Sequence, residues 1–472
     1  MRSPTAHPLF WLTLQIVVTT VLLVYSGDLE PQRVADTKSY EIAADLDSLQ
    51  ARLGYYRSLG YPLFLNIVEG LGFSHRAVPT IQLGAFFVSI YLLWFALWRL
   101  SGSKWLAYAA VSPLPWAAVV ALVDRIQPDF LSASATIVAI SSVGLLVVAP
   151  RRILWWGALI LSVAAAYHLR PAAVFLVGFV PLMGGVFYLA LVRGSLRQAL
   201  RLGLLIGIAT VVPYLSFCGL RWFAVGHMGL VSFGGTNLAG LAANFVSGKA
   251  IVDLPREDRS LARRFLKIRR RNGWEPMTMD SAIEVHFAQY SDNIWKVANP
   301  AGKLELTERR TDLKKARAKA GDVEISLQTW ERQPSQVARN TIVGETAKAL
   351  VAARPKLYFR WVRGALVYGL KQLPQYVWIL GPLIVIIVSL PVLLIRCPQV
   401  NRKVQVDAGP SAEAVLVSLI ILGLGYFVIY LLLVSLVSFP FQRYFQSMIL
   451  FLPTTMCVQV FEIWRRIGRS LS

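Results

Sequence analysis

Asp36 is the carboxylate whose position in the chain best suits proton transfer. It lies beyond the first long apolar run and just before a stretch with helical spacing. An aspartate at that point can cap the N-terminus of the helix that follows. It can also act as a general base that accepts a proton from a hydroxyl group at the mouth of a membrane cavity. One side chain can do both, so the sequence leaves the two roles open.

Two pairs of acidic residues nearby have the spacing of simple metal-binding motifs, namely Asp45-Leu46-Asp47 and Asp28-Leu29-Glu30. We expect the first pair to lie in a helix, where side chains two residues apart point about 200° from each other and do not share an ion. The second pair lies outside that helix and can chelate. The sequence has no His, Cys and acid cluster with metal-ligand spacing and no glycine motif for phosphates or dinucleotides. We predict no metal site and no required cofactor, and leave open a divalent ion that assists.

The elements that position such side chains are membrane helices. Of 472 residues, 56% are hydrophobic and only 16% are charged, whereas a typical soluble domain is about 25% charged. Mean hydropathy is +0.54, and the apolar residues are clustered. The three cysteines lie in apolar runs or directly after one, so disulfides are not expected. These features exclude a soluble globule and predict an all-α polytopic membrane protein.

The net charge of +22 also occurs in nucleic-acid-binding proteins. Here, however, most basic residues flank apolar runs or lie in one long polar segment, which favours contact with a bilayer and an anionic lipid. We predict no nucleic-acid partner.

Ten apolar runs are long enough, or nearly so, to cross a bilayer as helices. The predicted spans are 9–25, 77–98, 105–123, 130–149, 153–168, 171–192, 201–224, 374–395, 413–437 and 444–463. On one side of the membrane, the connections between them carry fourteen Lys and Arg residues and one acid, Asp407. This bias predicts that both termini are cytoplasmic in a multi-pass protein of the inner (plasma) membrane.

Two polar segments then lie on the extracytoplasmic side and divide the chain. Residues 1–224 form a transmembrane core whose first outer loop, 26–76, contains amphipathic helices at 38–53 and 63–73. Residues 225–372 form a basic, mainly helical insertion, and 373–472 hold the last membrane helices. Within the insertion, the glycine-rich stretch 232–247 is a cavity rim or a plain loop, and 356–372 is predicted to be an interfacial amphipathic helix.

Several short motifs lie on the predicted outer side of the membrane. The first outer loop contains Asp36-x-x-x-Tyr40-x-x-Ala43 and Arg57-x-x-Gly60-Tyr61-Pro62-Leu63-Phe64-Leu65. Further along the chain are Gln127-Pro128-Asp129, Leu169-Arg170-Pro171, and Arg443-Tyr444 after Phe441-Gln442. In type and order these motifs resemble those of the GT-C glycosyltransferases that use polyprenyl-phosphate sugars, such as protein mannosyltransferases and lipid A aminoarabinose transferases. Residues 225–372 match no family pattern.

The resemblance implies a GT-C-like fold and an enzyme whose active site faces away from the cytoplasm. An acceptor hydroxyl on a lipid, glycan or protein attacks the anomeric carbon of the donor, polyprenyl phosphate leaves, and the configuration inverts. Asp36 matches the family position of the base. Arginines suit the leaving phosphate because their planar fork binds two oxygens. The implied substrate-binding residues are Tyr40, Arg57, Tyr61, Asp129, His168, Arg170, Arg443 and Tyr444.

Each of these residues also has a structural explanation. An arginine at the end of a span can be an anchor in the headgroup layer, and Tyr61 and Tyr444 can belong to an aromatic belt. Asp129 can cap the fourth span, and His168 can be an interfacial imidazole.

Two other functions fit the same composition. A transporter or lipid flippase also places charges in a polytopic body, but no matching half-repeats are present. A polysaccharide ligase or polymerase with a polyprenyl-diphosphate donor also fits a large, basic outer segment.

Overall fold

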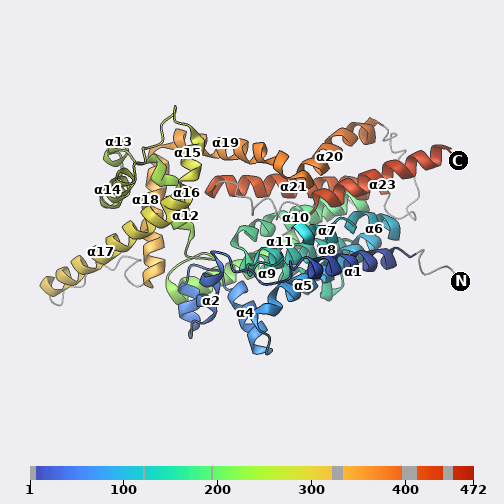
Figure 1. Ribbon diagram of the computed structural model, residues 1–472, viewed down its shortest axis with the longest axis horizontal. Coiled ribbons are helices and arrows are strands. Elements are labelled where there is room, and N and C mark those ends of the chain that lie inside the picture. Colours follow the sequence, from blue (N-terminus) through green and yellow to red (C-terminus); the bar gives the residue numbers. More distant parts are fainter. Residues whose placement is uncertain are drawn as a thin grey trace.

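A computed structural model describes residues 7–120, 123–192, 195–320, 333–395, 412–438 and 450–471. Within these ranges the chain is helical and has no β-strand. The one extended pairing there is an isolated parallel bridge between Gln32 and Arg125, which ties the first outer loop to the segment before the fourth predicted span. The predicted all-α class is confirmed for the described residues (Figure 1).

Six helical segments of the described chain are long and apolar enough to cross a membrane. Each matches one of the ten predicted spans, so the chain has the helices of a polytopic membrane protein. They are α1 (Pro8–Tyr25), the segment His75–Ser101 that ends in α5 (Val78–Ser101), α8 (Asp129–Val148), Pro171–Val192 around α10 (Leu176–Phe187), α11 (Leu196–Val225) and Ala414–Leu436 within α21 (Ala412–Val437).

The other four predicted spans are not confirmed. The third is divided near Pro113 into two short helices, because proline has no N–H to donate. The fifth is an apolar helix of 17 residues. A bend of 98° precedes the eighth, and part of the tenth lies outside the described residues. The helices concerned are α6 (Lys104–Val111), α7 (Leu114–Val120), α9 (Ile153–Leu169), α20 (Val377–Ile395) and α23 (Leu452–Leu471).

Helix α8 lies at the centre of the bundle, packed between α5 and α9. Most of its residues are buried, although many are small or carry a hydroxyl group. A Cβ added to Gly144 would lie 2.8 Å from Cδ1 of Leu100 in α5, so the Leu100 side chain would have to shift to admit a larger residue. Small residues at helix interfaces allow such close packing inside a membrane.

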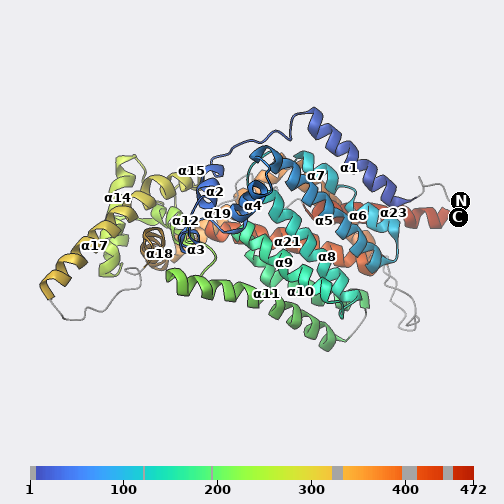
Figure 2. The same ribbon diagram turned by 90° about the horizontal axis from the view of Figure 1, so that it is seen from below.

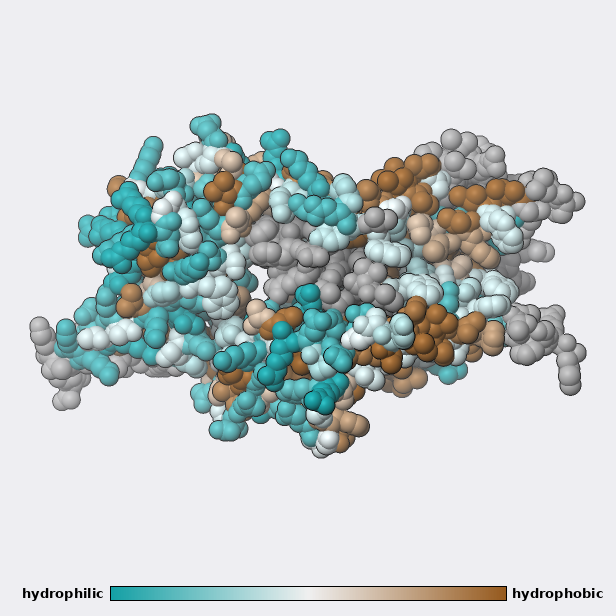
Figure 3. Space-filling view, in the orientation of Figure 1, coloured by the Kyte–Doolittle hydropathy of each residue, from teal (hydrophilic) through white to brown (hydrophobic). Residues whose placement is uncertain are grey.

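The bundle and the insertion form opposite ends of an elongated molecule. Both chain ends lie at the bundle end, and the helices of residues 234–353 lie at the other (Figures 1 and 2). In Figure 3 the face in view is hydrophilic over the insertion and carries hydrophobic bands along the bundle. This distribution fits a bundle in lipid with the insertion in water; the side of the membrane on which the insertion lies stays a prediction.

The first outer loop differs from its predicted helices. Instead of one helix over 38–53, it has α2 (Thr37–Ala44) and α3 (Leu49–Gly54). Ser48 separates them because its Oγ accepts a hydrogen bond of 3.1 Å from the backbone N–H of Ala51, which starts a new helix. The second amphipathic helix, α4, spans Gly60–Gly70 and so begins three residues before the predicted start.

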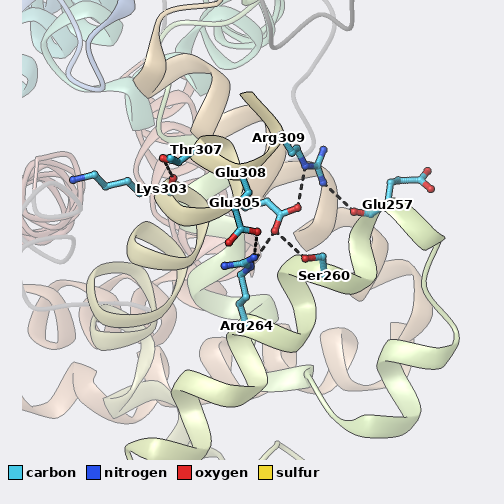
Figure 4. Close-up of polar contacts among 8 residues, drawn as sticks. All are labelled: Glu257, Ser260, Arg264, Lys303, Glu305, Thr307, Glu308 and Arg309. Carbon is cyan, nitrogen blue, oxygen red and sulfur yellow. Dashed lines mark hydrogen bonds and ion pairs between the residues drawn. The ribbon is translucent and has the colours of Figure 1, made fainter. Parts of the chain in front are cut away.

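The insertion is a layer of helices joined by buried polar contacts, as Figure 4 shows for one of them. The Glu305 carboxylate, 5% exposed, accepts hydrogen bonds from Ser260 and Arg264 (both 3.1 Å) and from Arg309 (3.0 Å). The main helices are α12 (Gly234–Ala242), α13 (Gly248–Val252), α14 (Arg256–Arg271), α15 (Ile283–Ala288), α17 (Asn299–Ala320) and α18 (Ser335–Ala353), followed by α19 (Pro355–Gln372). The predicted mainly helical insertion is confirmed for its described residues.

Arg221 connects the insertion to the first outer loop through hydrogen bonds. Its buried guanidinium lies near the C-terminal end of α11 and donates to the carbonyl of Leu53 from Nε (3.0 Å) and Nη2 (2.8 Å). It also donates to Ser232 Oγ (2.7 Å) and to the carbonyl of Gly229. One side chain therefore holds α11, α3 and the start of the insertion together.

A second buried arginine, Arg269, organises the interior of the insertion. It donates to Oδ1 of Asn293 (2.7 Å) and of Asn244 (3.1 Å), to Gln289 Oε1 (3.1 Å) and to the carbonyl of Glu275 (2.8 Å). Burial lowers the pKa of Arg269 to about 10. Four neutral acceptors thus stabilise a cation that is fully buried.

We expect Arg269→Met to destabilise the protein by about 2–3 kcal/mol, because buried amide oxygens lose their donor. Arg270→Met is the matched control, since Arg270 is the next residue and is exposed; it should change stability by less than about 0.5 kcal/mol. The measurement is thermal and denaturant unfolding of the full chain in detergent. Equal stability of the two variants would contradict the assignment.

Candidate functional site

An ion pair joins the candidate base to the first candidate arginine. Asp36 directly precedes α2, but its side chain makes no capping hydrogen bond. Its Oδ1 instead accepts a hydrogen bond of 2.5 Å from Nη2 of Arg57. Nε of Arg57 donates to Oγ of Ser39 (2.7 Å), which in turn donates to the carbonyl of Asp36 (2.6 Å). The chain folds back on itself here, so residues 21 positions apart form one small network.

Aromatic rings surround the Arg57 guanidinium. Its Cζ lies 4.8 Å from the ring centroid of Tyr40 and 5.1 Å from that of Tyr56, within the range of cation–π attraction. Burial acts to lower the pKa of Arg57, but Tyr40 and Asp36 more than offset it, and the pKa is raised overall. Arg57 is therefore a fixed positive charge in a site that is only partly open to solvent.

Tyr61 continues this network toward the bundle. Its ring is fully buried, with its centroid 5.1 Å from that of Tyr40 in an edge-to-face arrangement. The hydroxyl donates to Oε1 of Gln82 (3.2 Å). Burial raises the pKa of Tyr61, and Tyr40 and Asp129 add to the effect, so Tyr61 stays a neutral phenol.

Asp129 and Arg170 form a second ion pair. Asp129 is the first residue of α8, and Arg170 is the residue at which α9 ends. Both side chains are largely buried. Cζ of Arg170 lies 5.9 Å from the ring centroid of Tyr430 in α21. The pair therefore links the N-terminal end of α8 and the C-terminal end of α9 to a third apolar helix, and it provides the acidic partner that a buried arginine requires.

The two ion pairs are adjacent because α4 lies directly on the end of α9. A Cβ added to Gly60 would lie 2.6 Å from the carbonyl carbon of His168. Ser58 Oγ donates to the carbonyl oxygen of Leu169 (3.3 Å). We use the name outer cluster for the six predicted residues that these contacts bring together: Asp36, Tyr40, Arg57, Tyr61, Asp129 and Arg170.

We expect Gly60→Ala to displace α4 from α9 and to destabilise the protein by about 1–3 kcal/mol, because its Cβ would meet backbone rather than a flexible side chain. Gly70→Ala, at the other end of the same helix, meets no atom within 4 Å and should leave stability unchanged or slightly improved. The measurement is the midpoint of thermal unfolding in detergent. A wild-type midpoint for Gly60→Ala would disprove the close approach.

Three predicted residues remain, namely His168, Arg443 and Tyr444. The backbone of His168 lies against Gly60, while its ring packs edge-on against Phe217, with centroids 4.3 Å apart, and next to Tyr167. Arg443 and Tyr444 lie outside the described residues. Three further residues contact the outer cluster and were not predicted from the sequence: Ser39, Tyr56 and Gln82.

Among them, Gln82 is the one with a recognisable sequence feature, because it is a lone amide in an apolar span. Its Nε2 donates to the carbonyl of Arg125 (3.2 Å).

A row of aromatic rings leads from the outer cluster to the insertion. Tyr55 and Tyr56 have ring centroids 4.5 Å apart, Tyr56 and Phe233 5.6 Å, and Phe233 and Trp295 5.8 Å. Trp295 at the far end is 49% exposed. Phe233 precedes α12 in the glycine-rich stretch 232–247, so this stretch does approach the candidate site.

No group of three or more His, Cys, Asp or Glu side chains that could hold a metal ion occurs among the described residues. Asp45 and Asp47 lie in the bend after α2 rather than in a helix, so the helical argument against metal binding there was wrong. The positive charges of the outer cluster are instead guanidinium groups. Chemically, the cluster combines a partly exposed carboxylate with two fixed cations that can bind an anion.

The chain was compared with protein-family models, with curated proteins and with solved structures. None of them matches it.

Proposed function

We propose that this protein is a membrane glycosyltransferase that moves a sugar from a polyprenyl-phosphate donor to a lipid, glycan or protein acceptor on the extracytoplasmic face of the inner membrane. One observation carries the proposal. Two Asp–Arg pairs lie on segments that pack against each other, one in the loop before α4 and one where α8 begins and α9 ends. A polyprenyl phosphate places its hydrocarbon chain in the bilayer and its negatively charged phosphate at the level where membrane helices end. Arginines at that level can bind the phosphate.

In the proposed reaction the acceptor hydroxyl attacks the anomeric carbon, and the bond from that carbon to the phosphate oxygen breaks. The Asp36 carboxylate takes the hydroxyl proton, and polyprenyl phosphate leaves with the bonding electrons. This single displacement inverts the anomeric configuration.

Arg57 affects both the proton transfer to Asp36 and the departure of polyprenyl phosphate. Its guanidinium is bound to Asp36 and Ser39. The donor phosphate is a diester with one negative charge, and its two non-bridging oxygens can compete with Asp36 for the same guanidinium, because the planar fork of arginine binds two phosphate oxygens in parallel. Donor binding would thereby release the Asp36 carboxylate for proton transfer.

Arg170 supplies the second fixed charge. Negative charge grows on the phosphate as it leaves, and cations that are already in position stabilise the transition state more than the ground state. Two arginines can meet this charge, so the proposed step needs no metal ion. The aromatic row from Tyr55 to Trp295 offers flat surfaces on which acceptor sugar rings can stack.

The test is transfer of label from a synthetic polyprenyl-phosphate sugar by purified full-length protein, with a membrane extract as the source of acceptors. We expect labelled product and free polyprenyl phosphate in equal amounts. A matched polyprenyl-diphosphate sugar should not react. Transfer from the diphosphate donor alone would support a ligase, and movement of intact donor across vesicles without transfer would support a flippase; either result would overturn the proposal.

A further inference from the structure

Helix α19 connects the insertion to the membrane bundle at the level where a span ends. The hydroxyl of Tyr358 donates to the carbonyl of Leu436 (2.9 Å), and Nε1 of Trp361 donates to the carbonyl of Ser438 (3.0 Å). Leu436 is the last residue of the apolar span in α21. The first turns of α19 therefore lie at the boundary between the bilayer and water.

The two faces of α19 differ sharply. Trp361, Ala365 and Gly369 are buried on the inner face, and a Cβ on Gly364 would collide with Cδ1 of Ile283. The outer face is exposed and follows helical spacing, and it carries both cationic and apolar side chains. Its exposed residues are Lys356, Phe359, Arg363, Val367, Leu370 and Lys371.

A surface hollow lies at the start of this outer face. It is lined by Met279, Pro355, Lys356, Phe359, Arg360 and Arg363. Arg360 is held in place because it donates to the carbonyl of Ser281 (2.6 Å) and to that of Thr278. Phe359 is 70% exposed and Met279 55% exposed, so the hollow combines positive charge with bare apolar surface.

Nothing within the described chain neutralises the three cations. Lys356, Arg360 and Arg363 form no ion pair with the described residues, and α19 contains no acidic residue. Asp280 in the adjoining turn is the nearest acid in sequence to the hollow, and it makes no ion pair with them. An anion bound at the depth of the lipid headgroups would neutralise these three cations.

We propose that this hollow binds the headgroup of an anionic phospholipid of the surrounding bilayer. The phosphate diester is held by Lys356, Arg360 and Arg363, and the acyl chains run along Val367 and Leu370 toward the bundle. Two features favour a membrane lipid over a soluble anion. The hollow is at the bilayer boundary, and its walls include apolar side chains that a soluble anion would leave in water.

The exposed face of α14 provides an internal control for charge. It carries Arg263, Lys267, Arg270 and Arg271 around another surface hollow. This hollow lies in the insertion at the far end from the chain termini (Figures 1 and 2). It has the same type of charge, but it is placed away from the boundary that the end of α21 marks.

The experiment titrates the full-length protein in neutral detergent with phosphatidylglycerol and, separately, with phosphatidylcholine, and counts bound lipid by native mass spectrometry. We expect wild type to prefer phosphatidylglycerol. The double variant Lys356→Gln/Arg363→Gln should weaken phosphatidylglycerol binding about 30-fold, the combined effect of two surface cations. The double variant Arg263→Gln/Lys267→Gln removes the same charge from α14 and should bind like wild type.

Three results would overturn the proposal. These are equal binding of the two lipids by wild type, unchanged phosphatidylglycerol binding by the α19 variant, and an equal loss in the α14 variant, which would indicate attraction by net charge alone. Because the readout is lipid binding, it does not depend on the glycosyltransferase proposal.

Discussion

Asp36→Asn is expected to lower the rate of sugar transfer by about 10²- to 10⁴-fold, the usual contribution of a general base. Asparagine has the same size, and its oxygen can still accept the hydrogen bond from Arg57, so the loop should keep its position. It cannot take the proton of the attacking hydroxyl. The measurement is the single-turnover rate of label transfer, with the thermal unfolding midpoint recorded on the same sample.

Asp47→Asn is the matched control for this variant. Asp47 belongs to the same loop, is exposed and lies in the bend after α2, so its loss should leave the rate unchanged. If Asp36→Asn transfers sugar at the wild-type rate, Asp36 is not the base and the carboxylate serves only to hold Arg57.

Arg57→Lys is expected to reduce kcat by about 10²- to 10³-fold, comparable to the loss of one donor that stabilises transition-state charge. Lysine keeps the positive charge but has no planar fork, so it cannot bind Ser39 and a phosphate with the same geometry. Because the charge is retained, we expect the KM for the donor to change less than kcat. Steady-state kinetics over a range of donor concentrations separate the two.

Arg33→Lys is the control for Arg57→Lys. Arg33 lies in the same loop and forms an exposed ion pair with Glu41 at 2.9 Å; such pairs contribute little. A fall in kcat of similar size in both variants would indicate a general effect of arginine on the loop. An unchanged kcat in Arg57→Lys would show that the Arg57 guanidinium does not stabilise the transition state.

Much of the fold could be predicted because apolar run length directly limits which segments can cross a bilayer. Six of the predicted spans are helices that are long and apolar enough to cross a membrane. Predictions failed where local chemistry divides an apolar or amphipathic run. Pro113 divides the run 105–123, and the cap supplied by Ser48 divides the predicted helix 38–53. Neither interruption changes hydropathy, so a pattern of apolar residues alone does not reveal it.

The candidate site could be predicted only in part. The sequence indicates four candidate charged residues of the site, Asp36, Arg57, Asp129 and Arg170. It does not indicate that they form two ion pairs, because each pair depends on contacts between segments far apart in the chain. Gly60, for example, gave no sign that α4 would lie on the end of α9. Contacts such as Tyr56 with Phe233 form across 177 positions and leave no local pattern in the sequence.

The most direct test of the central claim is an experimental structure of the full-length protein with a non-hydrolysable polyprenyl-phosphate sugar bound. We predict that the phosphate lies between Arg57 and Arg170, that Arg57 has moved from Asp36 toward it, and that the Asp36 carboxylate faces the anomeric carbon. A donor phosphate bound at the other end of the bundle, or away from both arginines with the Asp36–Arg57 pair intact, would contradict the account.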